Sequence, residues 1–174
     1  MKRIIPETAR LQLREMEPSD IESLSSILQD SNTMYAYNGA FNGEETMIWI
    51  QKQLQRYKDF GFGSWGVRIR DRMIDQCGIT MQEYKGMEVP EISYLLAHEY
   101  WHKGYAVETA TVCREYGFNT LKFDELYSIV RDTNVASQKS GDSQWYEFRL
   151  FLLLNIIVEL ICPIVYSVKR LMFF

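Results

Sequence analysis

The sequence is poor in the residues that build disulfide frameworks and structural metal sites. It has three cysteines and two histidines among 174 residues. The cysteines, Cys77, Cys113 and Cys162, are widely spaced and include no Cys-x-x-Cys pair. Neither a disulfide scaffold nor a structural zinc site is therefore expected, and no metal is expected in the functional site.

The chain also lacks a surplus of basic residues. Its 19 lysines and arginines are outnumbered by 23 aspartates and glutamates, which gives a formal net charge of −4. A global positive field that would attract nucleic acid is absent, so no nucleic-acid partner is expected. The N-terminal sequence contains no long apolar run typical of a signal peptide, which favours a cytoplasmic protein. No internal repeat or low-complexity linker divides the chain.

What is present is the pattern of one mixed domain. The length fits a single domain, and 47% hydrophobic with 24% charged residues is ordinary for a globular protein. Apolar periodicity alternates between the two-residue and the helical period from Arg10 to Lys139. It predicts a strand at 11–14, helices at 21–28 and 47–61, strands at 64–70, 73–84 and 91–97, a helix at 105–121, a strand at 126–130 and a helix starting at 134–139. This order indicates a mixed α/β or α+β fold.

The most informative segment runs from Glu91 to Ala110, where a strand enters a glycine-containing loop that opens a helix. Unpaired backbone N–H groups and the helix dipole favour an anion at such a helix start. Gly104 and Ala106 are small enough for a phosphate to approach the backbone, and Lys103 adds a positive charge. A glycine before a helix is often only a turn, so the interpretation depends on the whole segment.

The sequence Trp-His-Lys-Gly-Tyr-Ala at 101–106 resembles the acetyl-CoA signature of the GNAT N-acetyltransferases, Arg/Gln-x-x-Gly-x-Gly/Ala. It is most similar to the branch that contains the ribosomal-protein alanine N-acetyltransferases of the RimJ/RimL type. Trp101 takes the Arg/Gln position, and His102 replaces the usual glycine of that branch. Supporting similarities at 8–14, 65–67, 76–79, 127–130 and 134–137 extend the resemblance over about residues 7–139.

The resemblance implies a GNAT acyl-CoA N-acyltransferase fold. This fold has a central, mostly antiparallel sheet with helices on both faces, and its fourth and fifth strands splay apart to admit the pantetheine arm of acetyl-CoA. A backbone N–H near Leu95 would polarise the thioester carbonyl, and the amides of 102–106 would bind the pyrophosphate. The implied acetyl-CoA-binding residues are Leu95, Leu96, Trp101, His102, Lys103, Gly104, Tyr105, Ala106, Asn134 and Ser137.

The same resemblance implies direct attack of a primary amine on the thioester, assisted by a general base. Glu91 is the candidate base, with a solvated strand-end carboxylate as the alternative. Ser137 is the candidate that protonates the departing thiolate, with a helix cap as the alternative. The remaining candidates are Cys77 and Cys113, interpreted as core thiols, and Trp49, Trp65 and Tyr37, which line either the acceptor cleft or the core.

Residues 140–174 depart from the family pattern. This tail is strongly apolar, and a membrane-spanning helix over 150–168 is one interpretation. Glu159 in its middle and Pro163 near its end oppose that interpretation, so no true membrane span is expected. The domain division that follows is an acetyltransferase core at 1–139 and an atypical tail at 140–174.

The genetic code suggests an origin for the tail. When residues 144–148 are back-translated and read one nucleotide later, the permitted residues include Asn-Gly-Met-Asn-Phe, the ending expected of the family. We therefore hypothesise a one-nucleotide insertion near the Lys139 codon, with a genuine extension as the alternative. In either case the two final strands of the family have no evident counterpart. An exposed sheet edge and formation of a homo-oligomer through that edge or the tail are then expected.

The function predicted from the sequence is transfer of an acetyl group from acetyl-CoA to a primary amine, either a protein N-terminus or a small molecule. The alternative is an inactive or impaired GNAT-like pseudoenzyme that binds only coenzyme A or a protein partner because its C-terminal strands are lost. A membrane-anchored protein is a third and weaker possibility.

Overall fold

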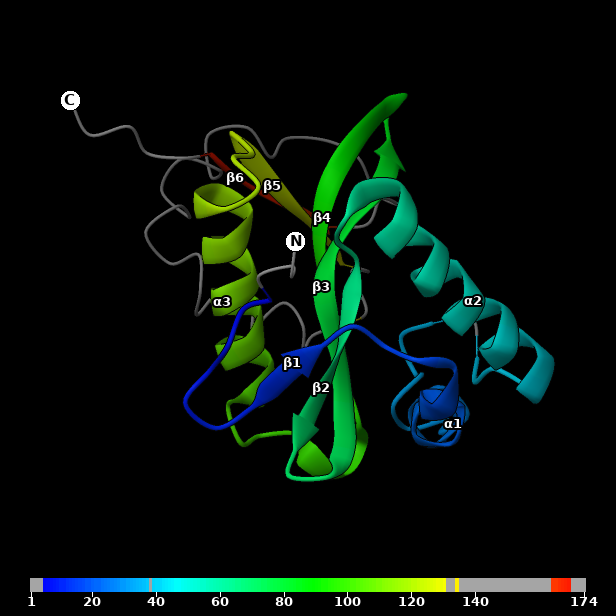
Figure 1. The fold of residues 1–174 in the computed structure, drawn as a ribbon. Helices are drawn as coiled ribbons and strands as arrows, with labels where there is room; N and C mark the ends of the chain where they lie inside the picture. The colour runs from blue at the N-terminus through cyan, green and yellow to red at the C-terminus, as the bar shows by residue number, and fades with distance from the viewer. Residues whose placement is uncertain (1–4, 38, 131–133, 135–163, 170–174) are drawn as a thin grey trace.

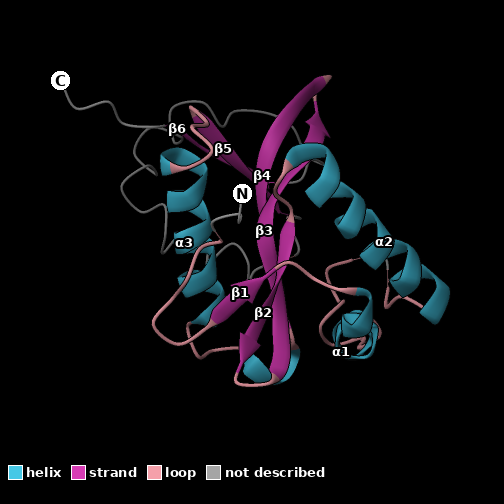
Figure 2. Cartoon of the chain, in the orientation of Figure 1, coloured by secondary structure: helices cyan, strands magenta, loops and turns pink. Residues whose placement is uncertain are grey.

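The structure is a computed structural model that describes residues 5–37, 39–130, 134 and 164–169. A central sheet separates α1 and α2 on one side from α3 on the other (Figures 1 and 2). The elements are β1 (Gln12–Arg14), η1 (Pro18–Asp20), α1 (Ile21–Leu28), α2 (Gly43–Phe60), β2 (Ser64–Ile69), β3 (Arg72–Tyr84), β4 (Met87–Leu96), η2 (His98–Tyr100), α3 (Tyr105–Asn119), β5 (Glu125–Val130) and β6 (Ile164–Lys169). Through β5 this order confirms the predicted one.

Local sequence signals fix both ends of α2. The Asn42 side chain accepts the Glu45 N–H at 2.9 Å, and the Glu45 carboxylate accepts the Asn42 N–H at 2.7 Å, which completes a capping box. Gly61 ends the helix in the left-handed conformation at φ 78°, which glycine adopts without strain. The buried face of α2 is formed by Thr46, Ile50, Gln53 and Tyr57. This face packs toward the sheet.

The sheet has the strand order β1-β2-β3-β4-β5-β6, and all neighbours are antiparallel except β4 and β5. The β3–β4 ladder is long and runs from Tyr84 opposite Met87 to Asp75 opposite Leu96. By contrast, β4 and β5 are paired only where Glu91 lies opposite Tyr127. The two parallel strands therefore separate beyond Glu91, which confirms the predicted splayed gap.

The structure corrects the expectation that no strand follows β5 and that its edge is open. Residues Ile164 to Lys169 of the tail form β6, which pairs with β5 from Glu125–Lys169 to Val130–Ile164. The stretch is rich in β-branched residues, which fit a pleated sheet better than a helix. The helix expected from 134 to 139 falls, apart from Asn134, outside the described residues, as does the tail up to 163.

The two faces of β3 have different partners. Asp75 and Cys77 face α3, whereas Gln76 faces α2 and accepts the indole N–H of Trp49 at 2.8 Å. Cys77 and Cys113 are buried 3.6 Å apart between their sulfur atoms, which confirms that both are core thiols. Across the described ranges, no helix is both long enough and apolar enough to span a bilayer.

Candidate active site

Glu91 lies where β4 and β5 begin to separate. Its side chain is buried, and one carboxylate oxygen accepts the backbone N–H of Ile129 on β5 at 3.2 Å. Burial raises the pKa of Glu91 to about 7, against the opposing effects of the Ile129 hydrogen bond and of the Arg56 charge on α2. The carboxyl group can therefore exchange a proton near neutral pH, which suits a general base better than a solvated carboxylate.

The end of β4 presents its backbone in two directions. Ala97 donates its N–H to Ile74 on β3 at 2.9 Å, so the backbone groups of the preceding residue, Leu96, point to the other side, toward the gap. The Leu96 carbonyl accepts the Trp101 indole N–H at 2.8 Å. The Leu95 N–H instead donates to the buried carboxylate of Asp75 at 2.9 Å. Leu95 and Leu96 were both predicted to contact the coenzyme. The backbone of Leu96 faces the gap, whereas the Leu95 N–H donates to Asp75.

The loop after β4 turns sharply into α3. His102 and Gly104 both have left-handed backbone conformations, at φ 61° and 79°. Regular helical bonding begins with the Glu108 N–H, which donates to the Gly104 carbonyl at 3.0 Å. The amides of Tyr105 and Ala106 consequently have no partner inside the helix. This is the predicted geometry for binding an anion at the start of a helix.

Lys103 does not extend toward these amides. Its ammonium group donates to the Glu99 carbonyl at 3.0 Å and lies 4.8 Å from the centre of the Tyr100 ring. The predicted contribution of Lys103 to an anion site would therefore require its side chain to leave these partners.

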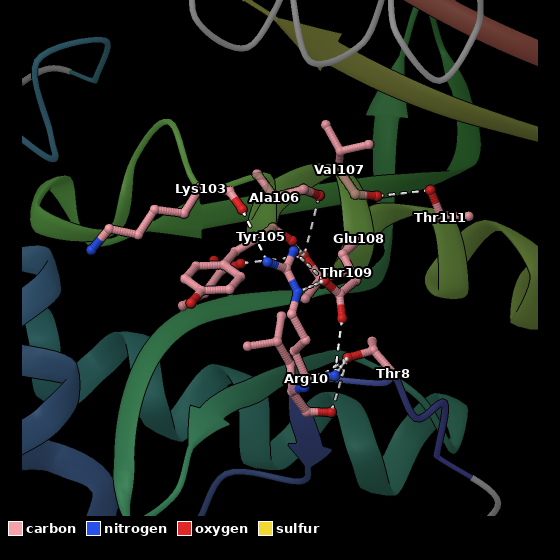
Figure 3. Close-up of polar contacts among 11 residues, drawn as sticks. Thr8, Arg10, Lys103, Tyr105, Ala106, Val107, Glu108, Thr109 and Thr111 are labelled. Carbon is pink, nitrogen blue, oxygen red and sulfur yellow. Dashed lines mark hydrogen bonds and ion pairs between the residues drawn. The ribbon is translucent and has the colours of Figure 1, made fainter.

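Arg10, which the sequence interpretation did not single out, joins the start of the sheet to the start of α3 (Figure 3). Its Nε atom lies 2.6 Å from the Glu108 carboxylate, and its Nη1 atom donates to the Lys103 carbonyl at 3.3 Å. The guanidinium also lies 4.6 Å from the centre of the Tyr105 ring. Arg10 and Glu108 are 98 positions apart, so no local pattern could have indicated this contact.

Three separate segments meet beside the gap. The Tyr35 hydroxyl donates to the Asn134 side-chain oxygen at 2.8 Å, and the Tyr35 ring meets the Trp101 ring edge-on at 5.7 Å between ring centres. The His98 N–H donates to the Thr33 hydroxyl at 3.0 Å. The structure thus brings the predicted residues Asn134 and Trp101 together through Tyr35, which sequence reasoning missed.

The other predicted residues divide between core and surface. Trp65 is buried in the core, Trp49 is half-buried and bonded to Gln76, and Tyr37 is exposed. Ser137, the candidate proton donor, lies outside the described residues. Among the side chains that the structure describes, no three metal-ligating groups come together.

A splayed pair of parallel strands that leads to a helix start is the arrangement that the resemblance to the GNAT N-acetyltransferases implied for an acetyl-CoA site. Comparison with known proteins agrees, because residues 10–140 match the acetyltransferase (GNAT) domain. The chain is also 32% identical over 133 residues to the Bacillus subtilis protein YkkB, covering 75% of this chain and 77% of that protein. The chain belongs to the GNAT family and is a GNAT-type N-acetyltransferase.

Solved structures show the same fold. An acetyltransferase from Agrobacterium tumefaciens matches with a TM-score of 0.76 at 20% identity, covering 98% of each chain. RimL, a ribosomal alpha-N-protein acetyltransferase solved in complex with coenzyme A, matches with a TM-score of 0.68 at 16% identity. That match covers 80% of this chain and 81% of RimL. The predicted GNAT fold is thereby confirmed.

Proposed function

We propose that the protein transfers the acetyl group of acetyl-CoA to a primary amine and that Glu91 is the general base. The observation that carries the proposal is the place of Glu91, a buried carboxylate at the point where β4 and β5 separate. A pKa near 7 lets Glu91 take up a proton from an attacking amine at neutral pH.

The coenzyme would extend from the gap to the helix. The Leu96 backbone faces the gap and would pair with the pantetheine amides, while the amides of His102 to Ala106 would bind the pyrophosphate. Trp101 and Asn134 border the same region and would contact the pantetheine arm. The residues present therefore fit a ligand with hydrogen-bonding amides at one end and a diphosphate at the other.

The chemistry needs no nucleophile from the protein. Acetyl-CoA supplies an activated thioester, whose C–S bond breaks as the new C–N bond to the amine forms. Glu91 accepts the proton that the amine nitrogen loses, directly or through one water molecule. The departing thiolate takes up a proton, for which Ser137 stays the predicted donor. A backbone N–H at the end of β4 would stabilise the negative charge on the carbonyl oxygen.

For the acceptor we propose a protein N-terminus, because RimL, which shares this fold, is an alpha-N-protein acetyltransferase. A small-molecule amine would undergo the same reaction, so the acceptor is decided by experiment. We also propose that the enzyme acts in the cytoplasm, where acetyl-CoA and nascent N-termini are both available.

The test measures release of the free thiol of coenzyme A from acetyl-CoA in the presence of peptides with free N-termini and of a panel of small amines. The matched control is a peptide that is already N-acetylated. Amine-dependent thiol release that disappears with the acetylated peptide supports the proposal. Saturable coenzyme A binding without turnover on any amine would contradict it and would favour the pseudoenzyme alternative.

A further inference from the structure

Asp75 is a buried carboxyl group for which the mechanism above has no use. It lies on β3 with no exposed surface. One oxygen accepts the Leu95 N–H at 2.9 Å, and the other lies 3.4 Å from the Thr109 hydroxyl. The backbone N–H of Gln76 is a further hydrogen-bond partner. Burying a carboxyl group is costly unless hydrogen bonds satisfy its oxygens, and these contacts offset part of that cost.

These partners place Asp75 between the two parts of the coenzyme site. Leu95 precedes Leu96, the residue of β4 whose backbone faces the gap. Thr109 lies on α3, one turn after Tyr105, at the helix start where the pyrophosphate would bind. The side chain of Asp75 therefore spans from the end of β4 to the first turns of α3.

The protons of this network can be arranged without conflict. The Thr109 hydroxyl has one proton and several acceptors within reach, among them the Tyr105 carbonyl at 3.0 Å, the Ala106 carbonyl at 3.2 Å and Asp75. Burial raises the pKa of Asp75 to about 7. When Asp75 is protonated, it can donate to Thr109, and Thr109 can then donate to Tyr105. An asparagine could make the same bonds, since its oxygen accepts from Leu95 and its amide donates to Thr109.

We propose that Asp75 is a positioning residue that fixes the spacing between the end of β4 and the start of α3, so that one coenzyme A molecule engages both at once. The inference rests on the proposed binding of acetyl-CoA and adds the group that holds the two halves of that site in register. Asp75 touches neither half of the ligand in this assignment. It acts through Leu95 and Thr109.

The proposal predicts an effect that depends on the length of the ligand. Coenzyme A would bind as a bivalent ligand, with its pantetheine and its nucleotide ends held at the two sites. A bivalent ligand gains affinity only when both sites have the right separation. If this spacing is lost, the protein should bind coenzyme A more weakly, but its affinities for pantetheine alone and for adenosine bisphosphate alone should not change.

The experiment compares these three probes on the full chain and its variants. Coenzyme A is titrated by calorimetry, and the two fragments are titrated by NMR. Asp75→Ala and Thr109→Val should lower the affinity for coenzyme A by about tenfold, and the affinity for each fragment should change by less than about twofold. The matched variants Asp75→Asn and Thr109→Ser, which keep the bonds, should retain affinity for coenzyme A. In steady-state kinetics, Asp75→Ala and Thr109→Val should each raise KM for acetyl-CoA more than they lower kcat.

Two results would overturn the inference while wild-type chain still binds coenzyme A. One is an equal loss of affinity for coenzyme A and for a fragment, which would show a local effect at one site. The other is unchanged coenzyme A binding in both Asp75→Ala and Thr109→Val. If Asp75→Ala does not fold, the Thr109 pair decides the question. Failure of the wild-type chain to bind coenzyme A would instead remove the proposed function on which the inference rests.

Discussion

The carboxylate of Glu91 accepts the backbone N–H of Ile129 at 3.2 Å, across the point where β4 and β5 part. In a continuous parallel sheet, an N–H in this position would donate to a carbonyl of the neighbouring strand. Because β4 has turned away, the Glu91 side chain takes the place of that carbonyl. The divergence of the strands leaves the Ile129 N–H without a carbonyl partner from β4, and the carboxylate proposed for catalysis accepts it instead.

The first prediction concerns Glu91→Gln. The glutamine oxygen can still accept the Ile129 N–H, so the fold and the affinity for coenzyme A should be retained. The base is lost, and kcat/KM should fall by about 10²-fold or more. Wild-type activity should rise with pH through about 7, because the base acts in its ionised form and burial raises its pKa to about 7. The variant should lack this rise.

The control for this prediction is the pH dependence of the activity of an Asp75 variant. Asp75 also titrates near pH 7, so its variant Asp75→Asn should keep the rise in activity if Glu91 alone is the base. A Glu91→Gln enzyme that turns over at the wild-type rate would remove Glu91 from the mechanism.

Periodicity in the sequence predicted the element order, because alternating and helical apolar patterns report directly on which side of each segment is buried. The splayed gap could not be predicted in this way. It depends on the single β4–β5 pairing at Glu91, and only the family resemblance indicated it. The tail strand β6 was not predicted, because the overall hydrophobicity of the tail indicates a membrane helix, whereas the β-branched residues within 164–169 favour a strand.

From the residues themselves the site was predicted only where one short segment supplies it, and Asn134 was indicated by the family resemblance alone. The turn at His102 and Gly104 is visible in the sequence because one short segment supplies it. Arg10, Tyr35 and Asp75 were not identified, since each contacts a partner between 20 and 99 positions away. Such contacts are created by the fold and leave no periodic signal.

The second prediction concerns Arg10→Ala. This change removes the ion pair with Glu108, the hydrogen bond to the Lys103 carbonyl and the contact with the Tyr105 ring. Because these contacts hold the loop that begins α3, affinity for coenzyme A should fall by about three- to tenfold, while stability falls by only about 1 kcal/mol. Calorimetry and urea unfolding measure the two effects.

Two control variants test whether the effect of Arg10→Ala comes from the contacts of its guanidinium group. Arg10→Lys keeps the charge but not the forked geometry, so its affinity should lie between those of wild type and Arg10→Ala. Lys58→Ala, at an exposed position on α2, should change neither quantity. Equal losses in Arg10→Lys and Arg10→Ala would show that geometry, not charge, matters, whereas wild-type affinity in Arg10→Ala would remove the loop-holding role.

The third prediction concerns the two left-handed residues of the loop. His102 has φ 61°, where a side chain costs free energy and glycine does not. His102→Gly should therefore raise the free energy of unfolding by about 0.5–1 kcal/mol. Gly104→Ala should lower it by about 1 kcal/mol, through strain at φ 79°, since an added Cβ would meet only Arg10 Nη2, at 3.6 Å. Opposite signs in urea unfolding are the expected result, and a destabilised His102→Gly would show that the imidazole makes a stabilising contact.

The fourth prediction concerns the pH dependence that Asp75 gives to stability. Burial raises its pKa from 3.8 to about 7, so between these values the folded state binds more protons than the unfolded state. The free energy of unfolding should fall as pH rises from about 4 to about 7, and this contribution should be constant above that range. Cys77, on the same face, does not titrate there because burial raises the pKa of its thiol. Glu91 adds a decrease of the same sign, because its folded pKa is also raised.

Asp75→Asn isolates the Asp75 contribution, because asparagine keeps the shape and cannot ionise. Urea unfolding at a series of pH values should show a smaller decrease for Asp75→Asn than for wild type, and the double variant with Glu91→Gln should be flatter still. At pH 8 Asp75→Asn should be the more stable protein, since wild type then keeps a charge buried without a compensating cation in the described contacts. Parallel curves for wild type and Asp75→Asn would mean that Asp75 has the same pKa in both states, and that its hydrogen bonds to Leu95 and Thr109 offset the cost of burying its charge.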